Sequence, residues 1–398
     1  MSDSPATTVS SRRWLTRGVL GIGLASLFSD WGHEAATSIL PTFLATLGAP
    51  AVALGLIEGI SDGFSSFAKL AGGWMADRPA WRKPTGIVGY LTTAVMTCCY
   101  GFARSWPMVL LLRAVGWIGR GSRGPSRDTL LAGAITPGQE GRAFGFERAM
   151  DNLGAVLGPL CAAALMGPLG VRPVLKWTLL PGSLAALAFA FLAPASKPSA
   201  GHRTSSFASG LSQLPKSYRR FLAGVFAHGI GDFAPTLLLL RASQILTPRM
   251  GVARAAAISV GLYTFHNFVD TLAAFPVGAL GDRIGKRGLL ALGYLIGVAA
   301  FAGFIFVPPS LPALAVLFGL AGTHVAFEQA LEKSLAAELI PPAVRGSGFG
   351  VLATANGIGD LVSSIVVGAL WSSVSPNAGF LYAGFFALLG AVLVYRWR

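Results

Sequence analysis

Ionisable side chains recur at intervals of three or four residues inside apolar stretches of this sequence. Such spacing places them on one face of a helix. Because burying an unpaired charge is costly, a chain that keeps many of them indicates a functional interior. The candidates for contact with a proton or a substrate are Asp30, His33, Glu34, Glu58, Asp62, Arg113, Arg120, Arg123, Arg127, His228, Asp232, His266, Asp270, His324 and Glu328.

Three histidines are each followed by a carboxylate four residues later. The pairs are His228/Asp232, His266/Asp270 and His324/Glu328. Imidazole and a buried carboxylate can both titrate near neutral pH, which suits a proton relay. The same groups are fitting ligands for a transition metal, and a purely structural network is the third interpretation. Spacing does not choose among them, because metal ligands would come from different helices, so the metal is left unknown.

Four arginines occupy one apolar stretch, at positions 113, 120, 123 and 127. Guanidinium binds carboxylate or phosphate in a bidentate manner, which favours an anionic or zwitterionic solute. An exporter of cationic drugs is expected to present mainly carboxylates and aromatic residues instead. The alternative is that nearby acids neutralise the arginines, which leaves the solute open.

The composition indicates that helices in a lipid bilayer position these residues. Of 398 residues, 53% are hydrophobic and only 12% are charged, whereas soluble domains carry about a quarter charged residues. The mean hydropathy is +0.62. The net charge of +14 does not indicate a nucleic-acid partner, because the basic residues lie between apolar runs. Cys98, Cys99 and Cys161 fall inside apolar runs and indicate neither disulfides nor zinc.

The apolar runs predict an all-α membrane protein with twelve transmembrane helices, since a crossing takes about 20 residues. The runs are 18–46, 51–76, 85–103, 107–135, 143–167, 173–194, 221–246, 254–280, 288–307, 311–339, 346–371 and 377–396. A polar stretch at 195–220 separates two bundles of six helices, at 1–194 and 221–398, as a cytoplasmic linker.

Basic residues near the ends of the runs predict the orientation, because cytoplasmic loops are enriched in Lys and Arg. Placing the N-terminus inside makes Arg12, Arg13, Lys83, Arg142 and Lys286 cytoplasmic, with many others. We therefore expect a multi-pass protein of the cell inner membrane with both termini in the cytoplasm.

An internal repeat appears at a fixed offset of 205 positions, the difference between residues 73 and 278. Residues 73–78 (GWMADR) match 278–283 (GALGDR), and residues 141–145 (GRAFG) match 346–350 (GSGFG). Two parallel repeats of six spans predict a substrate site near the bilayer midplane, between the halves.

The repeated loop resembles the signature of the major facilitator superfamily between the second and third helix of each half. The second copy has glycine at 278, Asp282 and Arg283, followed by the basic pair Lys286 and Arg287. The first copy has glycine at 73, Asp77 and Arg78, with one extra residue before its basic pair Arg82 and Lys83. The resemblance implies that these charged residues control conformation and do not bind substrate. It also implies a proton gradient as energy source, with no cofactor, and a monomer in the lipid bilayer.

A second motif, Gly154 to Pro159 with Gly158, is similar to the antiporter signature of that superfamily, although Ala162 and Ala163 replace its closing glycines. Glycines four residues apart allow two helices to touch, and a proline introduces a kink. The resemblance implies export by exchange with protons. An ordinary packing face is the competing interpretation.

The offset also places Arg123 on Glu328 and Arg127 on Glu332. These opposite charges predict an inner gate of ion pairs between the halves. The competing interpretation is that each charge is neutralised within its own half, for example by Asp62 or Asp151.

Together these observations predict secondary active transport of a small anionic or zwitterionic solute, as proton-coupled export. One alternative is export of a transition metal or metal chelate, and another is a receptor or scaffold that has kept a transporter fold. The sequence contains no nucleotide-binding loop, nucleophile elbow or zinc-protease motif, which argues against an enzyme.

Overall fold

The computed structural model describes residues 14–195 and 211–396, except for the side chains of residues 51, 52, 54, 55, 58, 236, 252, 253, 256 and 257. The predicted arginines Arg12 and Arg13, and most of the predicted linker, lie outside the described residues. The described part contains helices and no strand.

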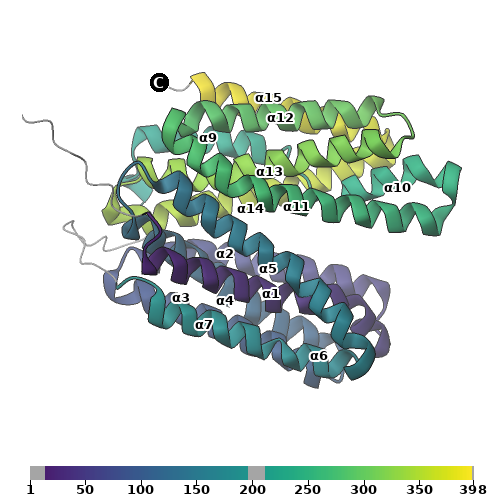
Figure 1. Ribbon diagram of the computed structural model, residues 1–398, viewed down its shortest axis with the longest axis horizontal. Coiled ribbons are helices and arrows are strands. Elements are labelled where there is room, and N and C mark those ends of the chain that lie inside the picture. The colour runs from purple at the N-terminus through teal and green to yellow at the C-terminus, as the bar shows by residue number, and fades with distance from the viewer. Residues whose placement is uncertain (1–13, 196–210, 397–398) are drawn as a thin grey trace, which may run out of the picture.

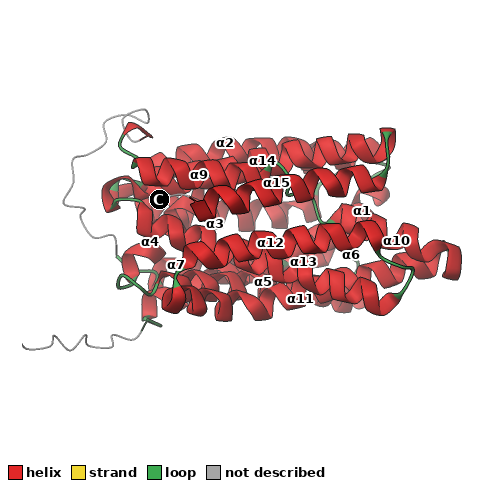
Figure 2. Cartoon of the chain, turned by 90° about the horizontal axis from the view of Figure 1, so that it is seen from above, coloured by secondary structure: helices red, strands yellow, loops and turns green. Residues whose placement is uncertain are grey.

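The helices fall into two groups in Figure 1, one below the other. The first group is α1 (Arg17–Thr46), α2 (Ala51–Ala76), α3 (Pro79–Cys99), η1 (Tyr100–Phe102), α4 (Trp106–Ala134), α5 (Glu140–Leu169), α6 (Val171–Trp177) and α7 (Leu179–Leu192). The second group is α9 (Lys216–Gly229), α10 (Thr236–Met250), α11 (Val252–Ile284), α12 (Lys286–Phe306), α13 (Leu311–Leu339), η2 (Pro342–Val344), α14 (Arg345–Ser373) and α15 (Pro376–Arg396). Figure 2 shows the long helices running along the longest axis of the molecule.

Seven of the described helical segments are long and apolar enough to cross a membrane. If α6 with α7 and α9 with α10 each count as one broken span, the described helices form twelve spans in two bundles of six. The predicted all-α fold is therefore confirmed. Helices such as α4 are less apolar because they carry the interior charges.

The break between α9 and α10 was not predicted, because the sequence reads as one apolar run from 221 to 246. Residues 230–235 leave the helix there. Glycine at 229 and 231 lowers helix propensity, and Pro235 disfavours helical backbone at Ala234. Ser363 and Ser364 of α14 hydrogen-bond to backbone groups of this segment, at the carbonyl of Asp232 and the amide of Ala234. These contacts satisfy groups that the missing helical turn leaves open.

Among the described residues, the buried apolar cluster that joins the halves lies at one end of the molecule. A continuous buried cluster there contains residues from α1, α3, α5, α9, α12, α13, α14 and α15, including Phe144 of α5 and Phe349 of α14, whose rings lie 5.7 Å apart. Toward the opposite end, the two other buried clusters each stay within one half. We call the shared end, where α1 begins and α15 ends, the closed end (Figure 1).

Candidate functional site

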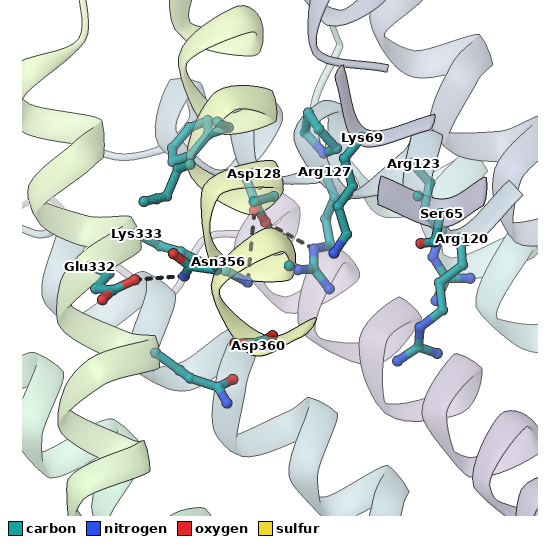
Figure 3. A pocket seen from close by; sticks show the side chains of 18 of the residues that line it. Ser65, Lys69, Arg120, Arg123, Arg127, Asp128, Glu332, Lys333, Asn356 and Asp360 are labelled. Carbon is teal, nitrogen blue, oxygen red and sulfur yellow. Dashed lines mark hydrogen bonds and ion pairs between the residues drawn. The ribbon is translucent and has the colours of Figure 1, made fainter. Parts of the chain in front are cut away.

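A polar cavity of about 550 Å³ lies between the two halves, with side chains from both (Figure 3). Phe349 and Leu352 line it and also belong to the apolar cluster of the closed end. The ionisable residues that line it are His33, Asp62, Lys69, Arg120, Arg123, Arg127, Asp128, Asp151, Asp232, Glu328, Glu332, Lys333 and Asp360. The structure thus brings together seven of the predicted contact residues and Glu332, which was predicted as a gating residue.

Two of the cavity arginines are neutralised within the first half. Arg127 lies 2.6 Å from Glu147 of α5 and 3.0 Å from Asp128. Arg120 forms an ion pair of 2.9 Å with Asp30 of α1. The predicted pairs Arg123/Glu328 and Arg127/Glu332 are absent, so the predicted inner gate is wrong for this conformation.

Arg123 differs from its two neighbours. Its side chain is 5% exposed and its guanidinium lies 4.1 Å from the centre of the Tyr90 ring. Among the described residues no carboxylate forms an ion pair with it, and its Nη1 atom has no hydrogen-bond partner. A buried guanidinium without an anion is costly. Arg123 can therefore accept an anion from the cavity.

The second half presents carboxylates to the same cavity. Glu332 accepts hydrogen bonds from the hydroxyl of Tyr294 and from Asn356 Nδ2, the latter at 2.8 Å. Asp232, Glu328 and Asp360 also line the cavity. Lys333 lies 3.7 Å from Asp128, which links α13 to α4 (Figure 3). Besides His33, the first half therefore lines the cavity with four cationic and three acidic side chains, whereas the second half gives it a mainly acidic wall of four carboxylates and one lysine.

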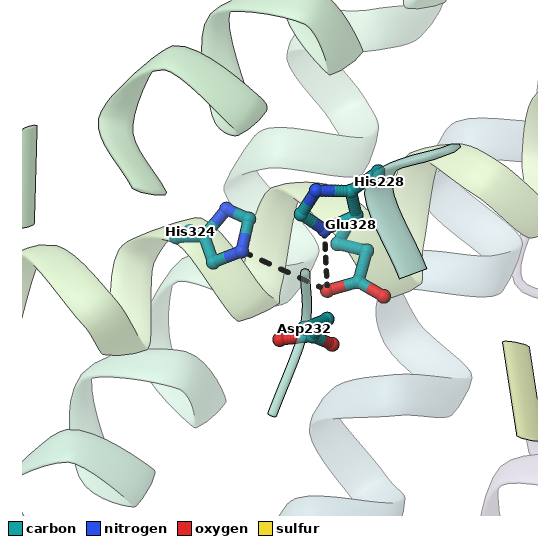
Figure 4. A group of neighbouring side chains, drawn as sticks. All are labelled: His228, Asp232, His324 and Glu328. Carbon is teal, nitrogen blue, oxygen red and sulfur yellow. Dashed lines mark ion pairs between the residues drawn. The ribbon is translucent and has the colours of Figure 1, made fainter. Parts of the chain in front are cut away.

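Two of the three predicted His/acid pairs meet. His228, Asp232, His324 and Glu328 lie together within the second half, with their ligand atoms within 4.8 Å of one another (Figure 4). His266 and Asp270 are separate from them. The His266 ring lies 3.1 Å from Asn267 Oδ1, and Asp270 pairs with Arg148 of α5 at 3.3 Å.

The remaining predicted contact residues surround the first-half wall. Trp117 Nε1 donates a hydrogen bond of 2.8 Å to Asp62, and the His33 ring packs on the same indole. Glu34 lies 3.6 Å from His33. Arg113 lies over the Trp117 ring at 4.1 Å. The side chain of Glu58 is outside the described part of the structure.

Glycines bring the halves into backbone contact at the closed end, at positions related by the 205-residue repeat. A Cβ atom on Gly141 of α5 would lie 2.0 Å from the carbonyl oxygen of Gly278 in α11. A Cβ atom on Gly346 of α14 would lie 2.5 Å from the carbonyl oxygen of Gly73 in α2. No side chain fits at either contact, so glycine is required for this approach.

The two motif aspartates bind the helix starts beside these glycines. Asp77 accepts hydrogen bonds of 3.1 Å from the backbone N–H of Ser347, near the start of α14. Asp282 accepts bonds of 2.7 and 2.9 Å from the N–H groups of Gly141 and Arg142, at the start of α5. Free N–H groups and the helix dipole both favour a carboxylate there. The contacts join the two halves.

The motif cations have mixed surroundings. Arg82 donates to the carbonyl of Ala76 at 2.6 Å, and Arg78 lies 3.6 Å from the centre of the Trp74 ring. Arg287 donates to the carbonyl of Val394 at 2.8 Å, whereas Arg283 is exposed. Arg78, Arg82 and Arg287 therefore contact their own half.

The motif of Gly154, Gly158 and Pro159 is a packing face. A Cβ atom on Gly154 would lie 2.2 Å from the carbonyl oxygen of Leu27, and one on Gly158 would lie 2.7 Å from the backbone nitrogen of Ala35. These glycines allow α5 to touch α1, and α5 continues as a helix past Pro159.

Several interior charges were not among the predicted site residues. Lys286 of α12 contacts Asp282 at 3.1 Å, Glu140 at 3.3 Å and also Glu338. Lys69, Glu147, Arg148, Lys333 and Asp360 also face the cavity or the interface between the halves. The sequence pattern that could have identified them is the same spacing of three or four residues, for example Asp151 three residues after Arg148.

Burial raises the pKa of Asp77 to about 6 from its ordinary value of 3.8, although hydrogen bonds from Ser347 and the charge of Arg82 act against the shift. Asp77 thus binds a proton more tightly at the closed end than when exposed. We expect the closed population to increase by about tenfold relative to the open one between pH 7 and pH 5. Spin-label distances across the closed end measure this. Asp77→Asn should remove this dependence, and a rise in opening on acidification would contradict the assignment.

Two bundles of membrane-crossing helices around a polar cavity that is closed at one end define a membrane transporter. The chain belongs to the major facilitator superfamily, whose model matches residues 22–265 and 221–398. It is therefore a multi-pass membrane transporter of small molecules and not an enzyme.

Relatives in sequence extend over most of the chain. An uncharacterized MFS-type transporter of Methanocaldococcus jannaschii is 26% identical, with 96% of this chain and 95% of the relative covered. The cis,cis-muconate transport protein of Acinetobacter baylyi is 25% identical, covering 79% and 77%. The fosmidomycin resistance protein of Escherichia coli is 26% identical, covering 99% and 98%.

Solved structures show the same fold. The human organic anion transporter MFSD10 matches with a TM-score of 0.74 at 18% identity, over 95% of this chain and 99% of that one. A bacterial homologue of the iron transporter ferroportin matches with a TM-score of 0.75 at 15% identity, over 96% and 99%.

Proposed function

We propose that this protein is a proton-coupled exporter of a small solute that carries an anionic group. The observation that carries the proposal is Arg123, a buried guanidinium on the cavity wall to which no described carboxylate is paired. An incoming carboxylate or phosphonate supplies the missing anion and binds through two parallel hydrogen bonds.

The two walls of the cavity extend this to a zwitterion. A solute held at Arg123 by its anionic group has the acidic wall of Glu332 and Asp360 opposite. A cationic group on the same solute is attracted to that wall. Simple anions lack this second contact, so zwitterions should bind more tightly than anions of the same size.

Asp30 is the proposed coupling carboxylate. It is buried, and it pairs at 2.9 Å with Arg120, which lines the cavity. Arg123 on α4 and Asp151 on α5 are the other charges that act on it. A proton on Asp30 cancels the charge that holds Arg120. Proton uptake and the position of Arg120 on the cavity wall are therefore linked.

The relatives support the solute class and the direction. One is named for transport of cis,cis-muconate, which is an anion, and a protein of the same fold is an organic anion transporter. Export is supported by the relative that confers fosmidomycin resistance and by multidrug resistance proteins at 27–29% identity.

The proposal includes an orientation. Motif residues Arg78, Arg82 and Arg287 lie near the closed end, and cytoplasmic loops are enriched in such residues. We place the closed end on the cytoplasmic side of the cell inner membrane. The halves 1–194 and 221–398, joined by 195–220, would then rock as a monomer to expose the cavity to either side.

The test uses purified protein in liposomes with a pH-sensitive dye in the lumen. Organic anions, zwitterions, cationic drugs and divalent metals are added outside under an imposed proton gradient. Antiport predicts that an anion or zwitterion makes the lumen more alkaline as it enters, and Asp30→Asn is expected to abolish this change. Solute flux that persists in this variant separates loss of coupling from loss of transport.

Three outcomes would contradict the proposal. Acidification of the lumen would show symport, and a response only to cationic drugs would exclude Arg123 as the anchor. No response to any class, from protein that elutes as a single folded species, would favour a receptor or scaffold that has kept the fold. Arg172→Gln is a matched control, because Arg172 donates to the carbonyls of Gly101 and Ala103 and lies over the Phe43 ring, and it does not line the cavity.

A further inference from the structure

Four potential metal ligands meet at the acidic wall of the cavity. His228 is near the end of α9, Asp232 lies in the break before α10, and His324 and Glu328 are one turn apart on α13. Figure 4 shows Asp232 beside Glu328 and the two histidines. Broken helices at this depth are a structural feature of ion and substrate sites in transporters.

The surroundings of His324 orient it as a ligand. Its Nδ1 lies 2.9 Å from the carbonyl oxygen of Gly293 in α12. A carbonyl only accepts, so Nδ1 carries the hydrogen and the Nε2 lone pair points toward Glu328, 4.0 Å away. Metal-binding histidines commonly donate their other N–H in this way. Nε2 is buried and has no hydrogen-bond partner.

His228 is also held in place without a hydrogen bond. It is 1% exposed, and its ring stacks on Tyr294 with centroids 3.8 Å apart. Neither ring nitrogen has a hydrogen-bond partner, although Nε2 lies 3.7 Å from Glu328. A buried imidazole without a partner is costly. A bound cation would satisfy it.

The carboxylates lack a basic partner. Among the described residues, neither Asp232 nor Glu328 forms an ion pair with a lysine or arginine, and the nearest cationic candidates for Glu328 are the two histidines. Both carboxylates line the cavity, whereas both histidines lie behind them. The cluster therefore has an entry path from the cavity.

We propose that His228, Asp232, His324 and Glu328 bind one divalent transition-metal ion that enters from the cavity. Two imidazoles and two carboxylates suit Zn²⁺, Co²⁺, Fe²⁺ or Mn²⁺, whereas Ca²⁺ and Mg²⁺ prefer oxygen ligands alone. The ligand atoms lie within 4.8 Å of one another. In a tetrahedral site with bonds of about 2.1 Å, the ligand atoms are about 3.4 Å apart. Side-chain movements of up to about an ångström therefore complete the site.

This site does not depend on anion transport. Arg123 and Asp30 are on α4 and α1, whereas the four ligands are on α9, α13 and the break. The ion can be carried alone, or it can bind together with an anionic solute held at Arg123.

The test titrates the purified full-length protein, with its affinity tag removed, in lipid nanodiscs. Co²⁺ is followed by its visible absorption and Zn²⁺ by calorimetry. We expect one equivalent to bind with a Kd of about 1 μM or tighter, with the absorption of a four- or five-coordinate Co²⁺ site. Absence of binding at a hundredfold higher concentration would overturn the proposal.

Variants identify the ligands. His324→Ala and the isosteric Glu328→Gln are each expected to weaken Co²⁺ binding by at least about 100-fold. His324→Cys should retain Zn²⁺, because thiolate is a good ligand for it. His266→Ala is the matched control, since His266 is buried in the same half but outside the cluster. An equal loss of Co²⁺ binding in His266→Ala would overturn the assignment, and so would unchanged Co²⁺ binding in Glu328→Gln. Because each result is sufficient alone, the test holds even if one variant fails to fold.

Discussion

Replacing Arg123 with glutamine is expected to weaken transport of an anionic solute by about 10- to 150-fold in KM. The estimate corresponds to the loss of about 1.5–3 kcal/mol from hydrogen bonds to a charged group. The effect is large because Arg120 and Arg127 are already paired with Asp30 and Glu147, so they are poor substitutes. The measurement is uptake into proteoliposomes, with cis,cis-muconate as the first probe.

Arg123→Lys sharpens this test. Lysine keeps the charge but cannot form two parallel hydrogen bonds. We therefore expect Arg123→Lys to transport the anion better than Arg123→Gln but less well than the wild type. Transport of a neutral or cationic probe should not fall in either variant. Equal losses for all probes would assign Arg123 a structural role against Tyr90 instead.

Replacing Gly141 with valine is expected to reduce transport by at least about 100-fold while leaving the protein folded. The new Cβ would lie 2.0 Å from the carbonyl oxygen of Gly278, so α5 and α11 must separate. Both states are needed for a transport cycle, and this substitution removes the state with a closed end. Gly278→Val should act in the same way, because the contact is reciprocal.

The measurement is the distance between spin labels across the closed end, together with flux. Gly133→Val is the matched control, because Gly133 is near the end of α4 and a Cβ there has no atom within 4 Å. A closed end that remains fully populated in Gly141→Val would show that the backbone contact can relax. Flux would then be expected to survive.

The fold was predictable because lipid imposes a simple rule on sequence, namely long apolar helices with closed backbone hydrogen bonds. The break at 230–235 was missed because glycine and proline are also common inside intact membrane helices. Hydropathy also does not show that Ser363 and Ser364 hydrogen-bond to that segment, because these serines lie on a helix about 130 residues further along the chain.

The 205-residue repeat predicted which residues are equivalent but not which ones touch. Equivalent residues meet only when they lie on the axis that relates the halves. Gly73 is equivalent to Gly278, yet it contacts Gly346. Arg127 and Glu332 are also equivalent, but each is bound inside its own half. The predicted gate failed for this geometric reason. Two of the three His/acid pairs lie together because α9 and α13 are in contact.

The charge at the closed end is unequal on its two sides. Where α5 meets α11, Lys286 joins Asp282, Glu140 and Glu338. The position 205 residues earlier holds Trp81, which is exposed, and the basic pair of that loop copy starts at Arg82. Among the described residues, the seam between α2 and α14 has Asp77 and Ser347, while Arg82 donates to the carbonyl of Ala76 in its own half and does not bridge the halves. The contact between α5 and α11 is held by more ion pairs than the contact between α2 and α14, so it should separate last. Opening should begin between α2 and α14 and turn about α5 and α11, so that the solute leaves or enters through one lateral edge.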